Sequence, residues 1–205
     1  DSDGYDIQGH FLEVESEEGY CTVDFYVENQ KHTVDMAYYT ETSHHFLWDL
    51  RQGLPDSVVI CDRTQKFDLV QCIPSGVKTD WIGDSIAIAF PKNALFDTTY
   101  LQYRYYKNDD GNEIFELNNP TSPLRQFITV NLKPNGVYDL LKSGIYGMTD
   151  LGDLQYVGGE WEGNEMVFKT RDLVRYTIAT DTWRRLPSVS GYLAQENGPY
   201  DGASI

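Results

Sequence analysis

The sequence of 205 residues predicts an all-β chain, with antiparallel strands in a β-sandwich-like arrangement, two sub-domains and one short helix. Three observations predict this fold class. Residues 100–117 have the pattern of a β-hairpin, short segments of alternating apolar and polar residues recur along most of the chain, and Gly, Asp and Asn separate these segments. Alternation of period two buries one face of a strand, and the separating residues favour turns.

The predicted hairpin has the sequence YLQYRYYKNDDGNEIFEL. Asp110-Gly111 can adopt positive φ at both central positions of a two-residue type I′ turn, which matches the twist of the flanking strands. That register places Tyr106 opposite Phe115 and Arg104 opposite Leu117.

Other segments predict further strands. Residues 20–28 alternate, with Cys21, Val23, Phe25 and Val27 on one face. Residues 32–40 are expected to continue the same sheet with Val34, Met36 and Tyr38 inward. Residues 85–90 are apolar enough to lie in the middle of a sheet.

The short helix is predicted near residues 44–52. Ser43 can cap its N-terminus, Phe46, Leu47 and Leu50 would share a face, and Gly53 would end it. On a helix the neighbouring His44 and His45 would diverge by about 100°. They are therefore expected to be a surface pair and not a metal site or a general base.

Three cysteines, Cys21, Cys61 and Cys72, lack the close spacing of a zinc site. They allow one disulfide, most simply Cys61 to Cys72 within a hairpin of residues 57–61 and 67–73, which would leave one thiol over. The alternative is that all three are small buried apolar residues.

The charge distribution is uneven. Sixteen basic and 32 acidic residues give a net charge of −16, and residues 1–50 contain 12 acids but only one base, Lys31. Such a surface repels phosphate backbones and anionic lipids, so nucleic acid is not an expected partner. No run of about 20 apolar residues predicts membrane insertion. Cations and basic proteins are better candidates, unless the charge serves only solubility.

One acidic cluster opens the sequence. Asp1, Asp3 and Asp6 supply the carboxylate oxygens that Ca²⁺ prefers, but only as a fragment of such a site. A frayed acidic terminus is the alternative reading. No other cofactor is expected.

Known catalytic motifs are absent from the sequence. Gly83-Asp84-Ser85 is similar to the nucleophile block of GDSL-type hydrolases, but no histidine follows an aspartate at the DxxH spacing of that family. No Walker loop, GxSxG or dinucleotide fingerprint is present. The expectation is therefore that the chain is not an enzyme.

A segment rich in Pro and Asn suggests how the chain is divided. Residues 118–125, NNPTSPLR, cannot join a strand ladder and are predicted to be a linker or a crossover. They would separate an acidic N-terminal β-domain, residues 1–117, from a C-terminal β-meander, residues 126–187. An irregular tail, residues 188–205, would follow.

The C-terminal part carries one family resemblance. A predicted strand ends in Gly158-Gly159, a second ends in Tyr176, and Trp183 follows seven residues later. Residues 154–187 therefore resemble a single kelch motif, in which paired glycines allow close backbone approach and the aromatic residues pack strands together. The resemblance implies one propeller blade. An ordinary β-meander and a truncated propeller both remain open.

Aromatic and acidic residues are the candidate binding residues. Trp161, in the glycine-rich segment GGEWEG with Glu160 and Glu162, is the tryptophan most expected to be exposed. Trp81 is also a candidate, although it is expected, like Trp48 and Trp183, to pack in the core.

Three functions are considered, of which the first is the prediction and the other two are alternatives. The first is a non-enzymatic recognition or adhesion module, extracellular or displayed at the cell surface, that binds protein or glycan. The second is a structural subunit of a larger assembly such as a virion, a tail or a surface appendage. The third is a glycan-cleaving enzyme that uses Glu160 and Glu162 as paired acids.

Overall fold

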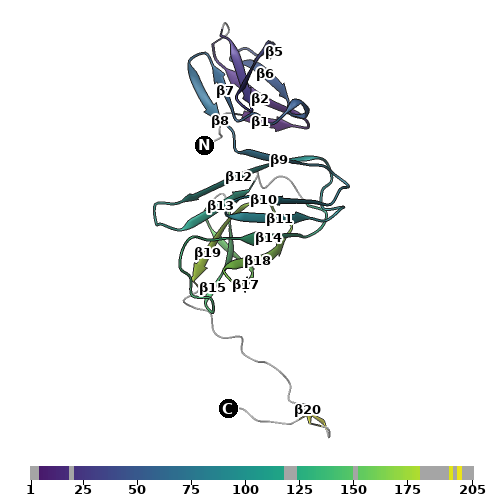
Figure 1. The fold of residues 1–205 in the computed structure, drawn as a ribbon, viewed down its shortest axis with the longest axis vertical. Helices are drawn as coiled ribbons and strands as arrows, with labels where there is room; N and C mark the ends of the chain where they lie inside the picture. The colour runs from purple at the N-terminus through teal and green to yellow at the C-terminus, as the bar shows by residue number, and fades with distance from the viewer. Residues whose placement is uncertain are drawn as a thin grey trace.

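The computed structural model describes residues 5–18, 21–117, 124–149 and 152–180, and the backbone of the short strands β20 (Ala194–Gln195) and β21 (Gly198–Pro199). The prediction of an all-β, sandwich-like fold is confirmed. Strands pair in antiparallel sheets, and Figure 1 shows a smaller N-terminal pair of sheets at one end of a larger pair. No described helix is long and apolar enough to cross a bilayer.

The N-terminal sandwich is built from two four-stranded sheets. The first has the strand order β1 (Tyr5–Gln8), β2 (Phe11–Ser16), β6 (His44–Asp49), β5 (Met36–Tyr39). The second has the order β4 (Gln30–Val34), β3 (Val23–Val27), β7 (Ser57–Ile60), β8 (Arg63–Lys66). Alternate residues of both sheets, among them Leu12, Val14, Val23, Phe25 and Val58, fill one apolar cluster.

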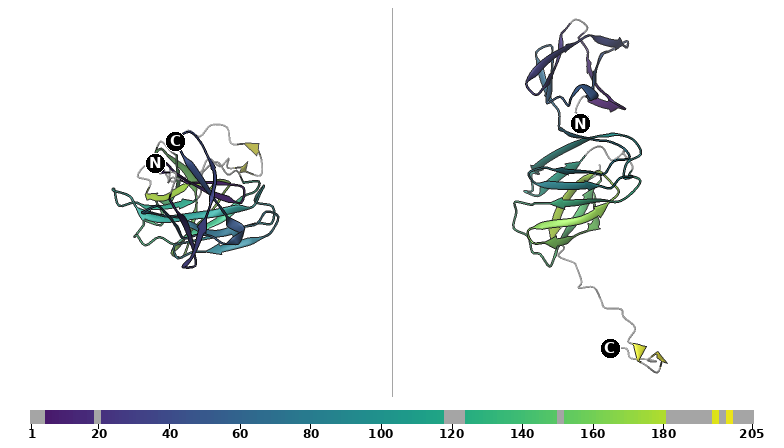
Figure 2. Two further views of the ribbon diagram at one scale, coloured as in Figure 1. Left: turned by 90° about the horizontal axis from the view of Figure 1, so that it is seen from above. Right: turned by 45° about the vertical axis from the view of Figure 1, so that its right-hand side comes forward.

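The C-terminal sandwich contains a five-stranded and a six-stranded sheet. The first has the order β10 (Thr79–Ile82), β11 (Ile86–Phe90), β14 (Ile128–Leu132), β18 (Glu165–Thr170), β17 (Glu160–Glu162). The second has the order β16 (Leu154–Gly158), β15 (Ser143–Met148), β19 (Arg175–Thr180), β13 (Glu113–Leu117), β12 (Thr99–Lys107), β9 (Leu69–Ile73). The two layers are visible in the right-hand view of Figure 2.

A second apolar cluster fills the C-terminal sandwich. Strand β11 lies between β10 and β14, as its apolar sequence predicts, and Ile86, Ile88 and Phe90 are almost completely buried. Residues on both sides of 118–125 contribute to this cluster, for example Phe115 and Val130. The apolar clusters therefore do not divide at residues 118–125, and the division into independently folding domains stays a prediction.

The two sandwiches meet around strand β12. Tyr100 belongs to the N-terminal cluster, whereas the next residue, Leu101, belongs to the C-terminal one. His10 Nδ1 lies 2.7 Å from the hydroxyl of Tyr100, and Gln102 Nε2 donates to the hydroxyl of Tyr5 at 2.7 Å. Polar side chains from β1, from the turn between β1 and β2, and from β12 thus bridge the junction.

The predicted helix at 44–52 is wrong for most of its length. Residues 44–49 form strand β6, and only Leu50–Gln52 form a short 3₁₀ helix, whose N-cap is Asp49 and not Ser43. Phe46, Trp48 and Leu50 are buried at alternate positions. This spacing of two residues is the periodicity of a strand and not of a helix.

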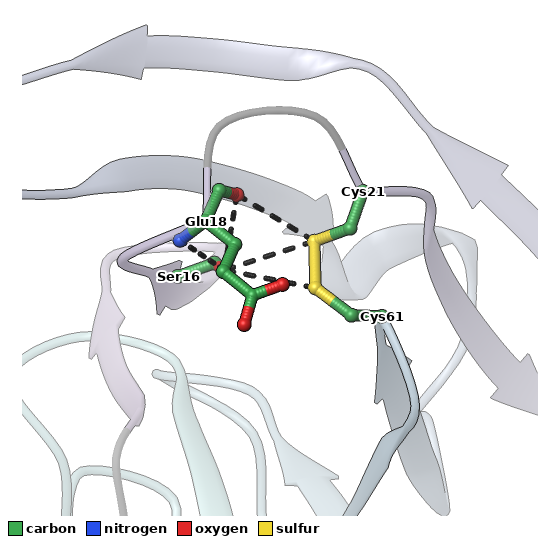
Figure 3. The surroundings of a disulfide bond; sticks show 4 residues. All are labelled: Ser16, Glu18, Cys21 and Cys61. Atoms are coloured by element: carbon green, nitrogen blue, oxygen red, sulfur yellow. Dashed lines mark hydrogen bonds between the residues drawn. A yellow bond between two sulfur atoms is a disulfide. The ribbon is translucent and has the colours of Figure 1, made fainter.

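The disulfide joins Cys21 to Cys61, and Cys72 is the exposed free thiol. The pair Cys61 to Cys72 is wrong because β7 turns at Cys61 into β8 of the N-terminal sandwich. Cys72 lies in β9 of the C-terminal sandwich, where it pairs with Tyr100 of β12. Strands β3 and β7 pair with Val23 opposite Ile60, which brings Cys21 and Cys61 together. Figure 3 shows Ser16 beside both sulfur atoms, at 3.7 and 4.0 Å.

The central hairpin exists, but its predicted register is wrong by one residue. Tyr105 faces Phe115, and Arg104 faces Glu116. The connection is a loop of residues 108–112 in which the Asn108 side chain accepts from the Asn112 amide at 2.8 Å, and Gly111 has φ 81°. This longer loop replaces the expected two-residue turn and turns Glu113 into the interior.

Residues 32–40 do not form one strand. The chain crosses from β4 in one sheet to β5 in the other, and Met36 and Tyr38 are both 44% exposed and not inward.

The strands of the kelch-like segment are divided between the two sheets of the C-terminal sandwich. Strands β16 and β19 lie on either side of β15, while β17 and β18 between them in sequence belong to the opposite sheet.

Candidate functional site

The predicted site around Trp161 lies on strand β17, at an edge of its sheet. Glu160 and Glu162 are exposed and share one face, as their spacing predicts, whereas Trp161 points to the other face and packs against the core. The Trp161 ring lies 6.1 Å from the ring of Tyr138, and its indole nitrogen is buried without a hydrogen-bond partner in the described part of the chain. Trp161 and the two glutamates therefore do not converge on a common site.

Trp81 occupies a similar half-buried position on strand β10. Its ring packs against the C-terminal core and meets Tyr103 edge to face, with ring centroids 5.3 Å apart. The Tyr103 hydroxyl is 2.6 Å from Ser85 Oγ, and burial raises the pKa of Tyr103 to about 12. This arrangement fixes Trp81 in the structure.

The acidic cluster at the N-terminus is only partly visible. Asp1 and Asp3 lie outside the described residues, and Asp6 is on strand β1, where its carboxylate accepts from the Ile7 amide at 2.8 Å and from the Gln8 side chain at 3.1 Å. The described residues hold no group of three or more His, Cys, Asp or Glu placed to bind a metal ion.

A buried carboxylate lies inside the C-terminal sandwich. The Glu113 side chain accepts hydrogen bonds from the Tyr105 hydroxyl, from the Tyr138 hydroxyl at 2.8 Å, and from the amides of Asn135 and Gly136 at 2.9 and 3.1 Å. Burial works to raise the pKa of Glu113, but these hydrogen bonds together lower it below its ordinary value. Glu113 thus anchors the segment around Asn135 to strand β13.

The best candidate for a binding site is a pocket at the junction of the two sandwiches. It has a volume of about 290 Å³ and is lined by Gly9, His10, Ser75, Phe96, Asp97 and Thr98. The turn between β1 and β2 forms one wall, and the segments that follow β9 and precede β12 form the other. This volume is near the lower end of ligand pockets, which are typically about 300–1,000 Å³.

The pocket combines one aromatic ring with several polar groups. Phe96 is 57% exposed, and the guanidinium of Arg125 lies 5.2 Å from its ring centroid. Ser75 Oγ donates to the carbonyls of Leu95 and Phe96, at 3.3 and 3.1 Å, which orders the wall. His10 uses Nδ1 for Tyr100, so Nε2 is the ring nitrogen that can meet a ligand.

Sequence reasoning missed this pocket because its residues are far apart in the chain. His10, Ser75 and Phe96 have no shared motif or spacing and come together only when the two sandwiches meet. The single available signal was Phe96-Asp97, an aromatic and an acid in the loop between two predicted strands.

Comparison with known proteins identifies the C-terminal sandwich. Residues 77–181 match the family model of the Zu5-like domain, which covers strands β10 to β19 and just over half of the chain. The chain therefore belongs to the Zu5-like domain family.

Other comparisons add no function. No curated protein matches this chain at a significant level. Among solved structures, the crystal structure of S. aureus TarS is similar with a TM-score of 0.22 and 11% sequence identity, over 82% of this chain and 34% of that chain. The chain thus spans about a third of the length of that protein, and a likeness at this level carries no argument about fold or function.

Proposed function

We propose that this chain is a recognition module, extracellular or displayed at the cell surface, that binds a sugar residue of a glycan in the junction pocket without catalysis at that site. The observation that carries the proposal is the pocket itself, where an exposed Phe96 ring lies beside Asp97, His10, Ser75 and Thr98. The disulfide between Cys21 and Cys61 is compatible with an oxidising compartment.

The chemistry of the lining favours a neutral, hydroxyl-rich ligand. The face of an aromatic ring is electron-rich and can pack against the C–H groups of a sugar ring. A carboxylate, an imidazole and two hydroxyls supply donors and acceptors for the sugar hydroxyls. Asp97 and the net charge of −16 disfavour an anionic ligand.

Binding to a glycan array, followed by titration of the selected glycan, tests the proposal. We expect Phe96→Ala to weaken binding at least about tenfold, because it removes the aromatic platform, and Asp97→Asn to weaken it as well. Phe127→Ala is the matched control, since Phe127 is also exposed, at 54%, and lies under the guanidinium of Arg171 at 4.7 Å. Equal affinity of the wild-type chain and Phe96→Ala would refute the proposal.

A further inference from the structure

A second cluster of reactive side chains lies on the outer face of the N-terminal sandwich, where strand β5 turns into β6. Ser43 Oγ lies 2.9 Å from His45 Nε2, and His45 Nδ1 lies 2.6 Å from Glu13 Oε1. Serine, histidine and carboxylate are thus connected in the order of a serine-hydrolase triad, through the same two ring nitrogens.

Hydrogen bonding determines where the protons lie. The Tyr38 hydroxyl donates to Glu13 Oε1, and this hydrogen bond is the largest cause of the raised pKa of Tyr38. An ionised carboxylate only accepts, so His45 must donate to Glu13 from Nδ1. In the neutral imidazole the lone pair of Nε2 then faces Ser43 Oγ, which is the arrangement of a general base next to a nucleophile.

Packing holds the imidazole in this orientation. The Tyr38 ring stacks on His45 with centroids 4.4 Å apart and an interplanar angle of 7°. The side chains of His45 and Glu13 are each only 13% exposed. His45 is therefore fixed on both sides, by the ring of Tyr38 and by the carboxylate of Glu13.

A hydrogen-bond donor also lies beside the nucleophile. Thr40 Oγ1 is 3.0 Å from Ser43 Oγ and accepts from the amides of Thr42 and Ser43, at 3.4 and 3.1 Å. The Thr40 hydroxyl also donates to the carbonyl of Ser43 at 3.3 Å. To stabilise a negative charge that develops near Ser43, it exchanges this hydrogen bond for one to the charged oxygen.

We propose that Ser43 is an activated nucleophile that cleaves carboxylic esters, with His45 as the general base, Glu13 as the residue that orients His45, and Thr40 as the oxyanion donor. This goes beyond the proposed recognition function, because it concerns another face of the chain and a chemical reaction. Ser43 lies just before strand β6, and the neighbouring residues Thr40 and Thr42 are exposed. This position at the surface suits an ester group displayed on a larger molecule.

The reaction has two balanced steps. Ser43 Oγ bonds to the acyl carbon while its proton moves to His45 Nε2, and the leaving alkoxide departs with that proton as an alcohol. Water then attacks the acyl carbon and gives its proton to His45 Nε2, and Ser43 leaves with this proton as the carboxylic acid is released.

Labelling of the whole chain with a fluorophosphonate probe tests this inference. Ser43 Oγ would bond to phosphorus and fluoride would leave. We expect the probe to label the wild-type chain at Ser43, Ser43→Ala to remove the label, and His45→Gln to slow labelling at least about 100-fold. Thr42→Ala and His44→Gln are matched controls for a neighbouring hydroxyl and a neighbouring imidazole, and both should label as the wild type does.

Hydrolysis of p-nitrophenyl acetate provides a second readout. We expect it to fall at least about 100-fold in Thr40→Val and to be retained in Thr40→Ser, which keeps the hydroxyl. Far-UV circular dichroism of each variant separates loss of the nucleophile from loss of the fold. The inference is overturned if folded Ser43→Ala is labelled, or hydrolyses the ester, as fast as the wild-type chain.

Discussion

Glu113 is a buried carboxylate in the C-terminal sandwich, and its hydrogen bonds link several of the surrounding segments. A carboxylate in an apolar core costs free energy unless hydrogen bonds replace its water. Two tyrosine hydroxyls and two backbone amides do so, and Thr177 Oγ1 also donates to the Glu113 carbonyl at 2.9 Å. These bonds join strand β13 to the segment around Asn135 and to strand β19.

We therefore expect Glu113→Gln to lower the free energy of unfolding at pH 7 by about 2–3 kcal/mol, because an amide cannot accept from all four donors. Urea denaturation of both chains measures this difference. Glu116→Gln is the control, since Glu116 lies at the surface and pairs with Arg104 at 2.8 Å, where such a pair contributes at most about 1 kcal/mol.

The same residue predicts a pH dependence. The pKa of Glu113 is lower in the folded chain than its ordinary value of 4.5. The ionised carboxylate therefore makes its full contribution to the free energy of unfolding above pH 4.5, and this contribution is lost as the pH falls through the folded pKa. The difference in unfolding free energy between the wild type and Glu113→Gln should shrink in that acidic range. If the difference in unfolding free energy stays constant until Glu113 is fully protonated, the charge of Glu113 makes no contribution to stability.

No sequence signal marks Glu113 as buried. It follows a loop and begins strand β13, in which Glu113, Ile114 and Phe115 are all buried, so burial does not alternate there. The environment of Glu113 depends on the register of the hairpin, and the expected Asp110-Gly111 turn gave the wrong register. Asn108 determines the register of the hairpin, because its side chain accepts a hydrogen bond that closes a longer loop than the local pattern predicts.

At the scale of elements, period-two burial could be predicted from the sequence, whereas the partners of each strand could not. Strand β3 lies where the alternation of residues 20–28 predicts it, and β11 lies where the apolar run of residues 85–90 predicts it. Residues 44–49 carry a pattern that fits both a helix and a strand, and the place between β2 and β5 decides for the strand. The cysteine pairing failed for the same reason, since it depends on which strands are neighbours.

The disulfide leads to a prediction for the N-terminal sandwich. Cys21 and Cys61 are 40 residues apart, and closing a loop of this size in the unfolded chain corresponds to about 3–4 kcal/mol of stability. We expect the double variant Cys21→Ser/Cys61→Ser to unfold at correspondingly lower urea concentration. Cys72→Ser, which removes an exposed free thiol, should unfold as the wild type does.

The paired glycines of the kelch-like segment also have a structural reason. They form the crossing from β16 in one sheet to β17 in the other, with φ of 118° at Gly158 and 104° at Gly159. A Cβ at Gly159 would lie 2.9 Å from Met166 Sδ and 3.0 Å from Ile145 Cγ1, whereas a Cβ at Gly158 would meet nothing within 4 Å.

Gly159→Ala should therefore destabilise the chain more than Gly158→Ala, by about 1–3 kcal/mol of additional overpacking. Both changes carry the strain of positive φ, so their difference isolates the contact with the core. Thermal unfolding of the two variants measures it. Equal melting temperatures would contradict this expectation, because they would mean that Met166 and Ile145 can move to make room for a Cβ at Gly159.

For the whole molecule, the fold class and the acidic character could be read from the sequence, but the association of the two sandwiches could not. Their contacts involve single residues such as His10, Tyr100 and Gln102, which carry no periodic signal. The candidate pocket depends on this association, and it was therefore invisible at the level of motifs.

Two apolar clusters predict two unfolding steps. Phe25 and Phe115 are both completely buried, one in each cluster, and truncation of a buried Phe costs about 3–5 kcal/mol. We expect Phe25→Ala to lower the transition of the N-terminal sandwich and Phe115→Ala that of the C-terminal one, followed by calorimetry. If both variants shift one common transition equally, the sandwiches unfold as a single unit.

The most direct test of the proposed function is an NMR titration of the wild-type chain with the glycan that binds best on the array. The account predicts that amide shifts change mainly at Gly9, His10, Ser75 and Phe96–Thr98, which line the junction pocket. Shifts that centre on Glu160–Glu162 instead, with the pocket unchanged, would contradict it.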